Sequence, residues 1–401
     1  MSAEQPPTIS GFVAPGFEGV RTAFEQNFER HGEVGATVSV VHRGTCVVDL
    51  VGGVSGESSD ELYSSDMVQM VFSVTKGATA MCAHLLAERG LLDLDAPVAS
   101  YWPEFAANGK SEIPVSWLLS HKSGLADVDR RLTFEDGVNW ETVTTALAES
   151  APMWEPGTQH GYHAVTFGWL VGEVIRRVSG TTVDAFFQQE FAAPLGLDFH
   201  IGLPHDQHSR IAPIIPMGPP PGMDFGSGES GTGVGFVEML EMLMGKDSLI
   251  ARALTAPGGA FNASEAWNHP DLWAAELPAA NGFANARSIA RLYAAAVGPV
   301  DGIQTLKPET IARAIEVQTQ GPDAVLVFEI PFGLGFMRDS PMSKFGGKAA
   351  FGHYGAGGAV GFADPEEQIG FGYAMNQMQL GIAGDPRSSG LIDATYAAIH
   401  S

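Results

Sequence analysis

Several features that define other protein classes are scarce in this sequence. Its 401 residues include only two cysteines, Cys46 and Cys82, so a disulfide-rich scaffold is excluded and at most one disulfide can form. No apolar run is long enough to cross a membrane, because glycine or a charged residue interrupts each of them. Residues 1–15 lack the basic start and apolar centre of a signal peptide. We therefore expect a cytoplasmic protein without a membrane partner.

Positive charge is scarce as well. The chain carries 22 Lys and Arg against 46 Asp and Glu, which gives a formal net charge of -24. Such a surface repels nucleic acid and anionic lipid, so we expect neither as a partner. The balance is typical of a self-repelling soluble protein, and adaptation to salt would produce the same pattern. Apolar residues make up 45% of the chain, enough for a sizeable core in one large or two closely packed domains.

Motifs of other enzyme classes are absent or stand in the wrong context. The pentapeptide Gly-x-Ser-x-Gly does not occur, which argues against an α/β-hydrolase with a Ser-His-Asp triad. Residues 226–231 fit a dinucleotide fingerprint but follow a proline-rich loop rather than a strand, so we interpret them as a flexible loop. His160 and His163 lack the glutamate of a metalloprotease helix and a third clustered ligand. We expect neither a metal nor an organic cofactor.

Hydrophobic periodicity indicates both helices and strands. Residues 17–31 have helical spacing and end near Gly32, and residues 36–42 and 45–51 are β-branched runs joined by a short turn, as in a hairpin. Residues 73–89 and 165–179 are also expected to be helical, each followed by glycine, and 91–105 to be irregular or to form short helices. The other expected helices lie at 115–119, 140–149, 288–297 and 389–400, and the other expected strands at 324–330, 333–337, 358–363 and 370–375.

The order of these elements predicts an α+β fold. Strands occur near both ends of the chain and can share one antiparallel sheet flanked by helices, while the strand-poor middle forms a mainly helical lobe. We place the domain with the central sheet at 1–75 and 285–401, and the mainly helical domain at 76–284. Within the middle, 213–222 is rich in proline and glycine and must be a loop, whereas 239–244 is a methionine-rich helical piece.

Ser73 and Lys76 are the strongest candidates for chemistry. A serine hydroxyl is a poor nucleophile unless a base takes its proton, and residues three apart share one face of a helix. Lys76 is the only lysine with a serine three positions before it, and both sit among small and apolar residues. The positive end of the helix would disfavour charge on Lys76 and would stabilise an oxyanion beside Ser73. We predict that Ser73 is a nucleophile.

Other segments make the sequence resemble the class C β-lactamase superfamily, with its β-lactamase/transpeptidase-like fold. The resemblance covers about residues 17–400 and is weakest between 195 and 280. Its strength lies in the order and spacing of several short motifs. In chain order they are Phe72-Ser73-Val74-Thr75-Lys76-Gly77, the turn at 89–95, the loop at 118–125, Glu155-Pro156-Gly157-Thr158 leading into Tyr162, and Gly352-His353-Tyr354-Gly355 on a late strand.

The resemblance implies a role for each matching residue. Ser73 would attack the acyl carbon and Lys76 would hold or remove its proton. Tyr162 would complete the base pair and return the proton to the leaving group; to act as a base it would need a cationic lysine to lower its pKa.

The resemblance also assigns residues around the substrate. The backbone amides of Ser73 and Ala356 would form the oxyanion hole. His353 would donate a hydrogen bond to substrate or to Tyr162, and Gly355 would let the strand approach the substrate.

Two departures from the β-lactamase pattern favour an ester as substrate. Ala164 stands where β-lactamases keep an asparagine that holds the amide of the β-lactam side chain. His353 replaces the lysine that meets the β-lactam carboxylate. The resemblance is therefore greatest to family VIII carboxylesterases, and it implies cleavage of short- to medium-chain carboxylic esters through a Ser73 acyl-enzyme.

Other functions of the same fold stay open at this stage. A β-lactamase, a D-amino-acid peptidase, an acyltransferase or a non-catalytic penicillin-binding-like protein would share most of these motifs. From position alone, Met223, Phe225 and the loop at 213–222 are expected to flank the acyl pocket. The natural ester and the oligomeric state are not predicted.

Overall fold

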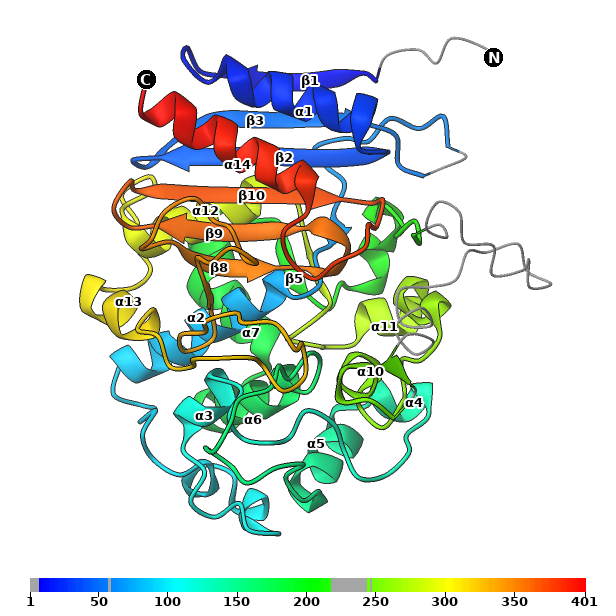
Figure 1. Cartoon of the computed structure of the whole chain (residues 1–401), viewed down its shortest axis with the longest axis vertical. Coiled ribbons are helices and arrows are strands. Elements are labelled where there is room, and N and C mark those ends of the chain that lie inside the picture. The colour runs from blue at the N-terminus through cyan, green and yellow to red at the C-terminus, as the bar shows by residue number, and fades with distance from the viewer. Residues whose placement is uncertain (1–6, 57–58, 218–243, 246) are drawn as a thin grey trace, which may run out of the picture.

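The computed structural model describes residues 7–56, 59–217, 244–245 and 247–401 (Figure 1). The glycine-rich segment 226–231, Met223, Phe225, the second half of the expected loop at 213–222 and all but the last residue of the expected helix at 239–244 lie outside the described residues.

A seven-stranded sheet joins the two ends of the chain. Its strand order is β1-β3-β2-β10-β9-β8-β7, and every neighbouring pair is antiparallel. At the centre of the sheet, the predicted hairpin pairs with the late strands. Val38, for example, lies opposite Tyr373. The strands are β1 (Ile9–Val13), β2 (Gly35–His42), β3 (Thr45–Gly53), β7 (Met337–Arg338), β8 (Phe351–Tyr354), β9 (Val360–Asp364) and β10 (Ile369–Met375).

Strand β10 shows why helices cover both faces of this sheet. Its glycines Gly370 and Gly372 point to one face, where an added Cβ would come within 2.4 Å of the backbone of α12 (Ala286–Val297). Glycine therefore lets α12 lie directly against the strands. The aromatic side chains of Phe371 and Tyr373 alternate to the other face, which α1 (Glu18–Arg30) and α14 (Pro386–Ile399) cover (Figure 1).

The middle of the chain forms the helical part below the sheet (Figure 1). Its central helix, α2 (Val74–Glu88), has thirteen of fifteen residues buried and packs on α6 (Phe167–Ser179) and against β8. The segment also contains a three-stranded sheet of β4 (Gln69–Met70), β6 (Gly282–Ala284) and β5 (Phe199–Ile201). No helix among the described residues is long and apolar enough to span a bilayer. The other α-helices of the described residues are α3 (Val115–Leu119), α4 (Phe134–Gly137), α5 (Trp140–Glu149), α7 (Val183–Phe187), α8 (Ala193–Leu195), α10 (Leu249–Thr255), α11 (Pro270–Ala274) and α13 (Pro308–Ala314).

Two of the expected strands were wrong. Residues 324–330 form a turn, because Asp323 Oδ1 accepts hydrogen bonds from the backbone amides of Val325 and Leu326, and Val327 adopts a φ of 69°. Residues 333–337 are also irregular except for the last, which begins β7. Strand β1 was not predicted. The α+β fold with a helix-flanked antiparallel sheet is confirmed, whereas the domain boundaries at 75/76 and 284/285 stay a prediction.

Candidate active site

Ser73 occupies the N-cap position of α2, and the backbone of the residue before it is strained. Phe72, immediately before it, has a φ of 44°, a left-handed conformation that is unusual for a bulky residue and typical of functional sites. The hydrogen bonds of Thr75 hold this bend, since its hydroxyl donates to Phe72 O and accepts from Gly282 N at 2.8 Å. The Ser73 side chain makes no capping hydrogen bond, so its Oγ is free for chemistry.

Lys76 lies one turn along the same helix face and is completely buried. Its Nζ is 2.8 Å from Ser73 Oγ, 2.6 Å from Ala164 O and 3.0 Å from Ala279 O. Burial lowers the pKa of Lys76 well below its usual range, because the charged form loses its hydration. A neutral amine fits these neighbours: two N–H groups can donate to the carbonyls while the lone pair faces Ser73.

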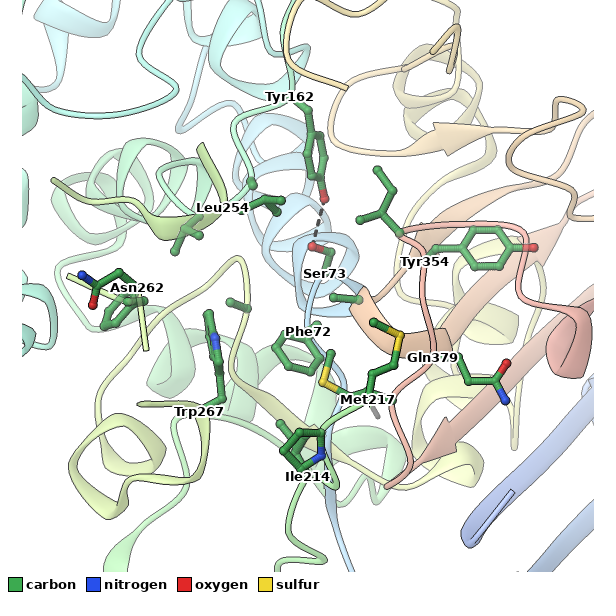
Figure 2. A pocket seen from close by; sticks show the side chains of 18 of the residues that line it. Phe72, Ser73, Tyr162, Ile214, Met217, Leu254, Asn262, Trp267, Tyr354 and Gln379 are labelled. Carbon is green, nitrogen blue, oxygen red and sulfur yellow. Dashed lines mark hydrogen bonds between the residues drawn. The ribbon is translucent and has the colours of Figure 1, made fainter. Parts of the chain in front are cut away.

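Tyr162 reaches the same serine from the segment before α6. Its hydroxyl donates to Ser73 Oγ at 2.9 Å, and the two groups point toward each other in Figure 2. Phe332 stacks on the Tyr162 ring at a centroid distance of 5.8 Å, and His121 packs beside it at 4.9 Å. Burial raises the pKa of Tyr162, and the hydrogen bond with Ser73 acts in the opposite direction. A raised pKa is the opposite of the lowered pKa that a tyrosine base would need, and the neutral hydroxyl is the hydrogen-bond donor to Ser73 Oγ.

Asp323 fixes the backbone of Tyr162 and was missed by the sequence analysis. Its Oδ1 accepts from Tyr162 N at 3.0 Å as well as from the amides of Val325 and Leu326, each at 2.8 Å. A further hydrogen bond, from Ala324 N to the carbonyl of His160, docks the same turn on the tyrosine segment. No local sequence signal distinguishes this aspartate from the other acidic residues.

Two backbone amides near Ser73 are available as donors. Among the hydrogen bonds of the described residues, none uses the amide of Ser73 or that of Ala356. Ala356 begins a short 3₁₀ turn, Ala356–Gly358, directly after β8, and both Ser73 and Ala356 line the same pocket. Unpaired amides at a pocket surface can receive a negatively charged oxygen.

His353 and Gly355 were predicted to bind substrate, and they lie next to residues that line the pocket. His353 is fully buried and neither residue is part of the described pocket wall, whereas Tyr354 and Ala356 are. His353 Nδ1 lies 3.0 Å from Tyr354 O, its ring centroid lies 6.0 Å from that of Tyr162, and burial lowers its pKa to about 3. A Cβ on Gly355 would meet Val71 O at 2.3 Å, so the glycine allows contact with the chain before Ser73.

The pocket beside Ser73 is apolar (Figure 2). It holds about 1040 Å³ of empty space, part of which is open to solvent. Of the expected loop at 213–222, Ile214, Pro216 and Met217 line it. No Lys, Arg, His, Asp or Glu is found among the described residues of its wall, which are Phe72, Ser73, Tyr162, Ala164, Val165, Ile214, Pro216, Met217, Leu254, Phe261, Asn262, Ala263, Trp267, Ala280, Tyr354, Ala356, Met378, Gln379 and Ile382.

His163, the residue after Tyr162, has a structural partner at each ring nitrogen. His163 Nδ1 donates to Gly161 O at 2.6 Å, and its Nε2 accepts from Leu125 N at 3.1 Å. Burial lowers its pKa to about 4. Within the described ranges, no group of three or more His, Cys, Asp or Glu side chains is placed to hold a metal ion.

Comparisons with known proteins place this arrangement in a family. The Beta-lactamase family model matches residues 20–388. LipL of Mycobacterium tuberculosis, an esterase/beta-lactamase, is 34% identical over 375 residues, which cover 92% of this chain and 83% of LipL. The crystal structure of a family VIII carboxylesterase is 36% identical with a TM-score of 0.85, covering 98% of this chain and 100% of that one.

A penicillin-binding protein homologue from Caulobacter crescentus is similar to the same degree. Its structure is 35% identical with a TM-score of 0.84 and covers 98% of this chain and 100% of its own. These likenesses confirm the β-lactamase/transpeptidase-like fold that the motifs implied. The chain belongs to the beta-lactamase family and is a hydrolase of the family VIII esterase/beta-lactamase type.

Proposed function

We propose that the protein is a serine carboxylesterase that cleaves neutral, short- to medium-chain carboxylic esters through an acyl-enzyme on Ser73. The observation that carries this proposal is the position of Ser73 Oγ, 2.8 Å from Lys76 Nζ and 2.9 Å from the Tyr162 hydroxyl, in a pocket whose described wall is uncharged. The esterase names of LipL and of the family VIII structure support the same reaction.

In the acylation step, Ser73 Oγ adds to the ester carbonyl carbon while its proton passes to the lone pair of Lys76 Nζ. The carbonyl oxygen becomes an oxyanion and accepts hydrogen bonds from the amides of Ser73 and Ala356. When the carbon–oxygen bond to the alcohol breaks, Tyr162 gives its hydroxyl proton to the leaving oxygen. The proton held by Lys76 then restores Tyr162, so the proton of Ser73 leaves, in effect, with the alcohol.

In the deacylation step, water takes the place of the alcohol. It adds to the acyl carbon and loses a proton to the same pair of side chains, and the tetrahedral intermediate expels Ser73 Oγ. The carboxylic acid is released and Ser73 recovers its proton. Every proton is carried by groups of this chain, so the steps need no metal or organic cofactor.

The choice of an ester rests on the pocket wall and on His353. A carboxylate on the substrate, as in β-lactams and peptides with a free C-terminus, would need a cationic partner to replace its hydration. The described wall offers none, and His353 is buried and neutral because its pKa is lowered to about 3. A neutral ester needs only the nucleophile, the proton donors and apolar contact.

The test compares wild type with Ser73→Ala on p-nitrophenyl butyrate and on a chromogenic cephalosporin, with mass spectrometry of the acyl adduct. We expect ester turnover and an adduct on wild type, and loss of both in Ser73→Ala by a factor of about 10⁴ or more. Full ester turnover by Ser73→Ala would refute the nucleophile. Rapid cephalosporin turnover without ester turnover would instead identify a β-lactamase.

A further inference from the structure

A buried arginine lies directly behind the turn that carries the Ala356 amide. Arg387, in the first turn of α14, has no solvent exposure. Its Nη2 donates to Gly357 O at 2.6 Å, so a residue far along the chain holds the peptide between Gly357 and Gly358. Gln379 N donates to the same carbonyl at 3.0 Å.

The turn needs such support because its backbone conformation is unusual. Gly357 and Gly358 have φ values of 84° and 129°, in the region that favours glycine. A Cβ on Gly358 would lie 2.4 Å from Asp385 Oδ2 and 2.5 Å from Arg387 Nη2. The turn is thus folded directly over the guanidinium group. Without this contact, we expect the two flexible glycines to leave the Ala356 amide poorly oriented.

The guanidinium group is held in one orientation by a full set of partners. Its Nε and Nη2 donate to Asp385, and its Nη1 donates to Glu33 Oε1 at 3.0 Å and to Gln377 O at 2.9 Å. Tyr373 in turn donates its hydroxyl to the other oxygen of Glu33. All five N–H groups are used, which matches the rigid fork of arginine and leaves little freedom to its contact with Gly357.

We propose that Arg387 is a positioning residue for the oxyanion hole: it holds the 356–358 turn so that the Ala356 amide faces the reacting oxygen. The proposal rests on the proposed function, since it assumes that the amides of Ser73 and Ala356 receive an oxyanion. Because a misplacement of about 1 Å at a catalytic group costs about 10²-fold in rate, the contact has a direct kinetic consequence.

The main experiment removes the guanidinium group while limiting the buried negative charge that is left without a partner. In the double variant Glu33→Gln/Arg387→Met, Asp385 keeps the N-cap hydrogen bond from the Arg387 backbone amide, which is 2.8 Å long in the wild type. The matched control is Glu33→Gln alone, which keeps Arg387 and its hydrogen bond to Gly357. The readouts are kcat and KM for p-nitrophenyl butyrate and the affinity for an alkyl boronic acid, which adds to Ser73 as a tetrahedral anion.

We expect kcat of the double variant to fall about 10²-fold, with KM changed less than about threefold, because the lost contact acts on the transition state. The affinity for the boronic acid should fall in parallel with kcat. Glu33→Gln should melt at a lower temperature yet keep kcat within about twofold of wild type. A folded double variant with wild-type kcat and boronic acid affinity would overturn the role of Arg387. Because that variant would still hydrolyse the ester, the result would not contradict the proposed esterase function.

A second variant covers the case in which the double variant does not fold. Glu33→Gln/Asp385→Asn/Arg387→Met removes the whole charge cluster, a replacement that is often neutral for stability, and asparagine remains a good N-cap. The same fall in kcat and boronic acid affinity is expected. Wild-type values in this folded triple variant would equally overturn the role of Arg387.

Discussion

Lys76 can serve as a base only in its neutral form. Burial lowers its pKa, so the amine loses its proton at a lower pH than an exposed lysine would. We therefore expect kcat/KM to rise with pH as Lys76 deprotonates, and to reach its plateau well below pH 10.5. The measurement is a pH profile of ester hydrolysis, and Lys76→Arg, which stays protonated, should lower kcat/KM by about 10³-fold at every pH. An active Lys76→Arg variant would contradict the assignment.

The Tyr162 hydroxyl and the Tyr162 ring have separable roles. Tyr162→Phe removes the proton donor but keeps the packing against Phe332 and His121, so kcat should fall by about 10²–10⁴-fold with little change in melting temperature. Tyr293→Phe is the matched control, because Tyr293 is also fully buried and its hydroxyl has no hydrogen-bond partner among the described residues. Equal losses in the two variants would show that the Tyr162 hydroxyl has no special role.

Local spacing was enough to pair Ser73 with Lys76, since both lie on one helix face. Tyr162 and Ala356 could be proposed only through the family resemblance, because the fold brings them from distant segments. Asp323 and Arg387 could not be found in either way. Each acts by accepting from or donating to backbone groups of another segment, and a backbone contact leaves no residue pattern in the sequence.

At the scale of elements, the turn at 323–328 supports the tyrosine segment. Asp323→Ala would leave the amides of Tyr162, Val325 and Leu326 without their acceptor, which should cost about 3 kcal/mol of the free energy of unfolding. It should also lower kcat, because Tyr162 loses its backbone anchor. Asp323→Asn keeps an acceptor oxygen and should retain most of both. Urea unfolding and ester kinetics check this, and equal losses in the two variants would contradict it.

Residues 370–375 and 324–330 show where the prediction of secondary structure succeeded and where it failed. Regular alternation in residues 370–375 reflects a strand between two packed layers, and β10 was predicted nearly to its ends. Residues 324–330 are equally apolar, yet they form a turn because the Asp323 carboxylate replaces the strand partners of the backbone amides. Hydrophobic periodicity indicates which residues are buried, but it does not indicate which group accepts the hydrogen bond of a backbone amide.

At the scale of the whole molecule, charge should select the substrate. The chain carries a net charge of -24, and the described pocket wall is uncharged. An ester with its own carboxylate is therefore repelled at long range and, once bound, loses hydration without gaining a cationic partner. The matched pair is p-nitrophenyl butyrate and mono-p-nitrophenyl succinate, which have the same leaving group and acyl chains of similar length.

We expect kcat/KM to be at least about tenfold higher for the butyrate at low salt. Adding salt to 0.5 M should narrow the difference without abolishing it, because ions screen the long-range repulsion and leave the dehydration of the carboxylate unchanged. Hydrolysis of the neutral butyrate should depend little on salt. Equal kcat/KM values for the two esters would contradict selection by charge and would indicate a cation near the acyl chain, whereas a difference that vanishes at 0.5 M salt would assign the whole effect to the surface.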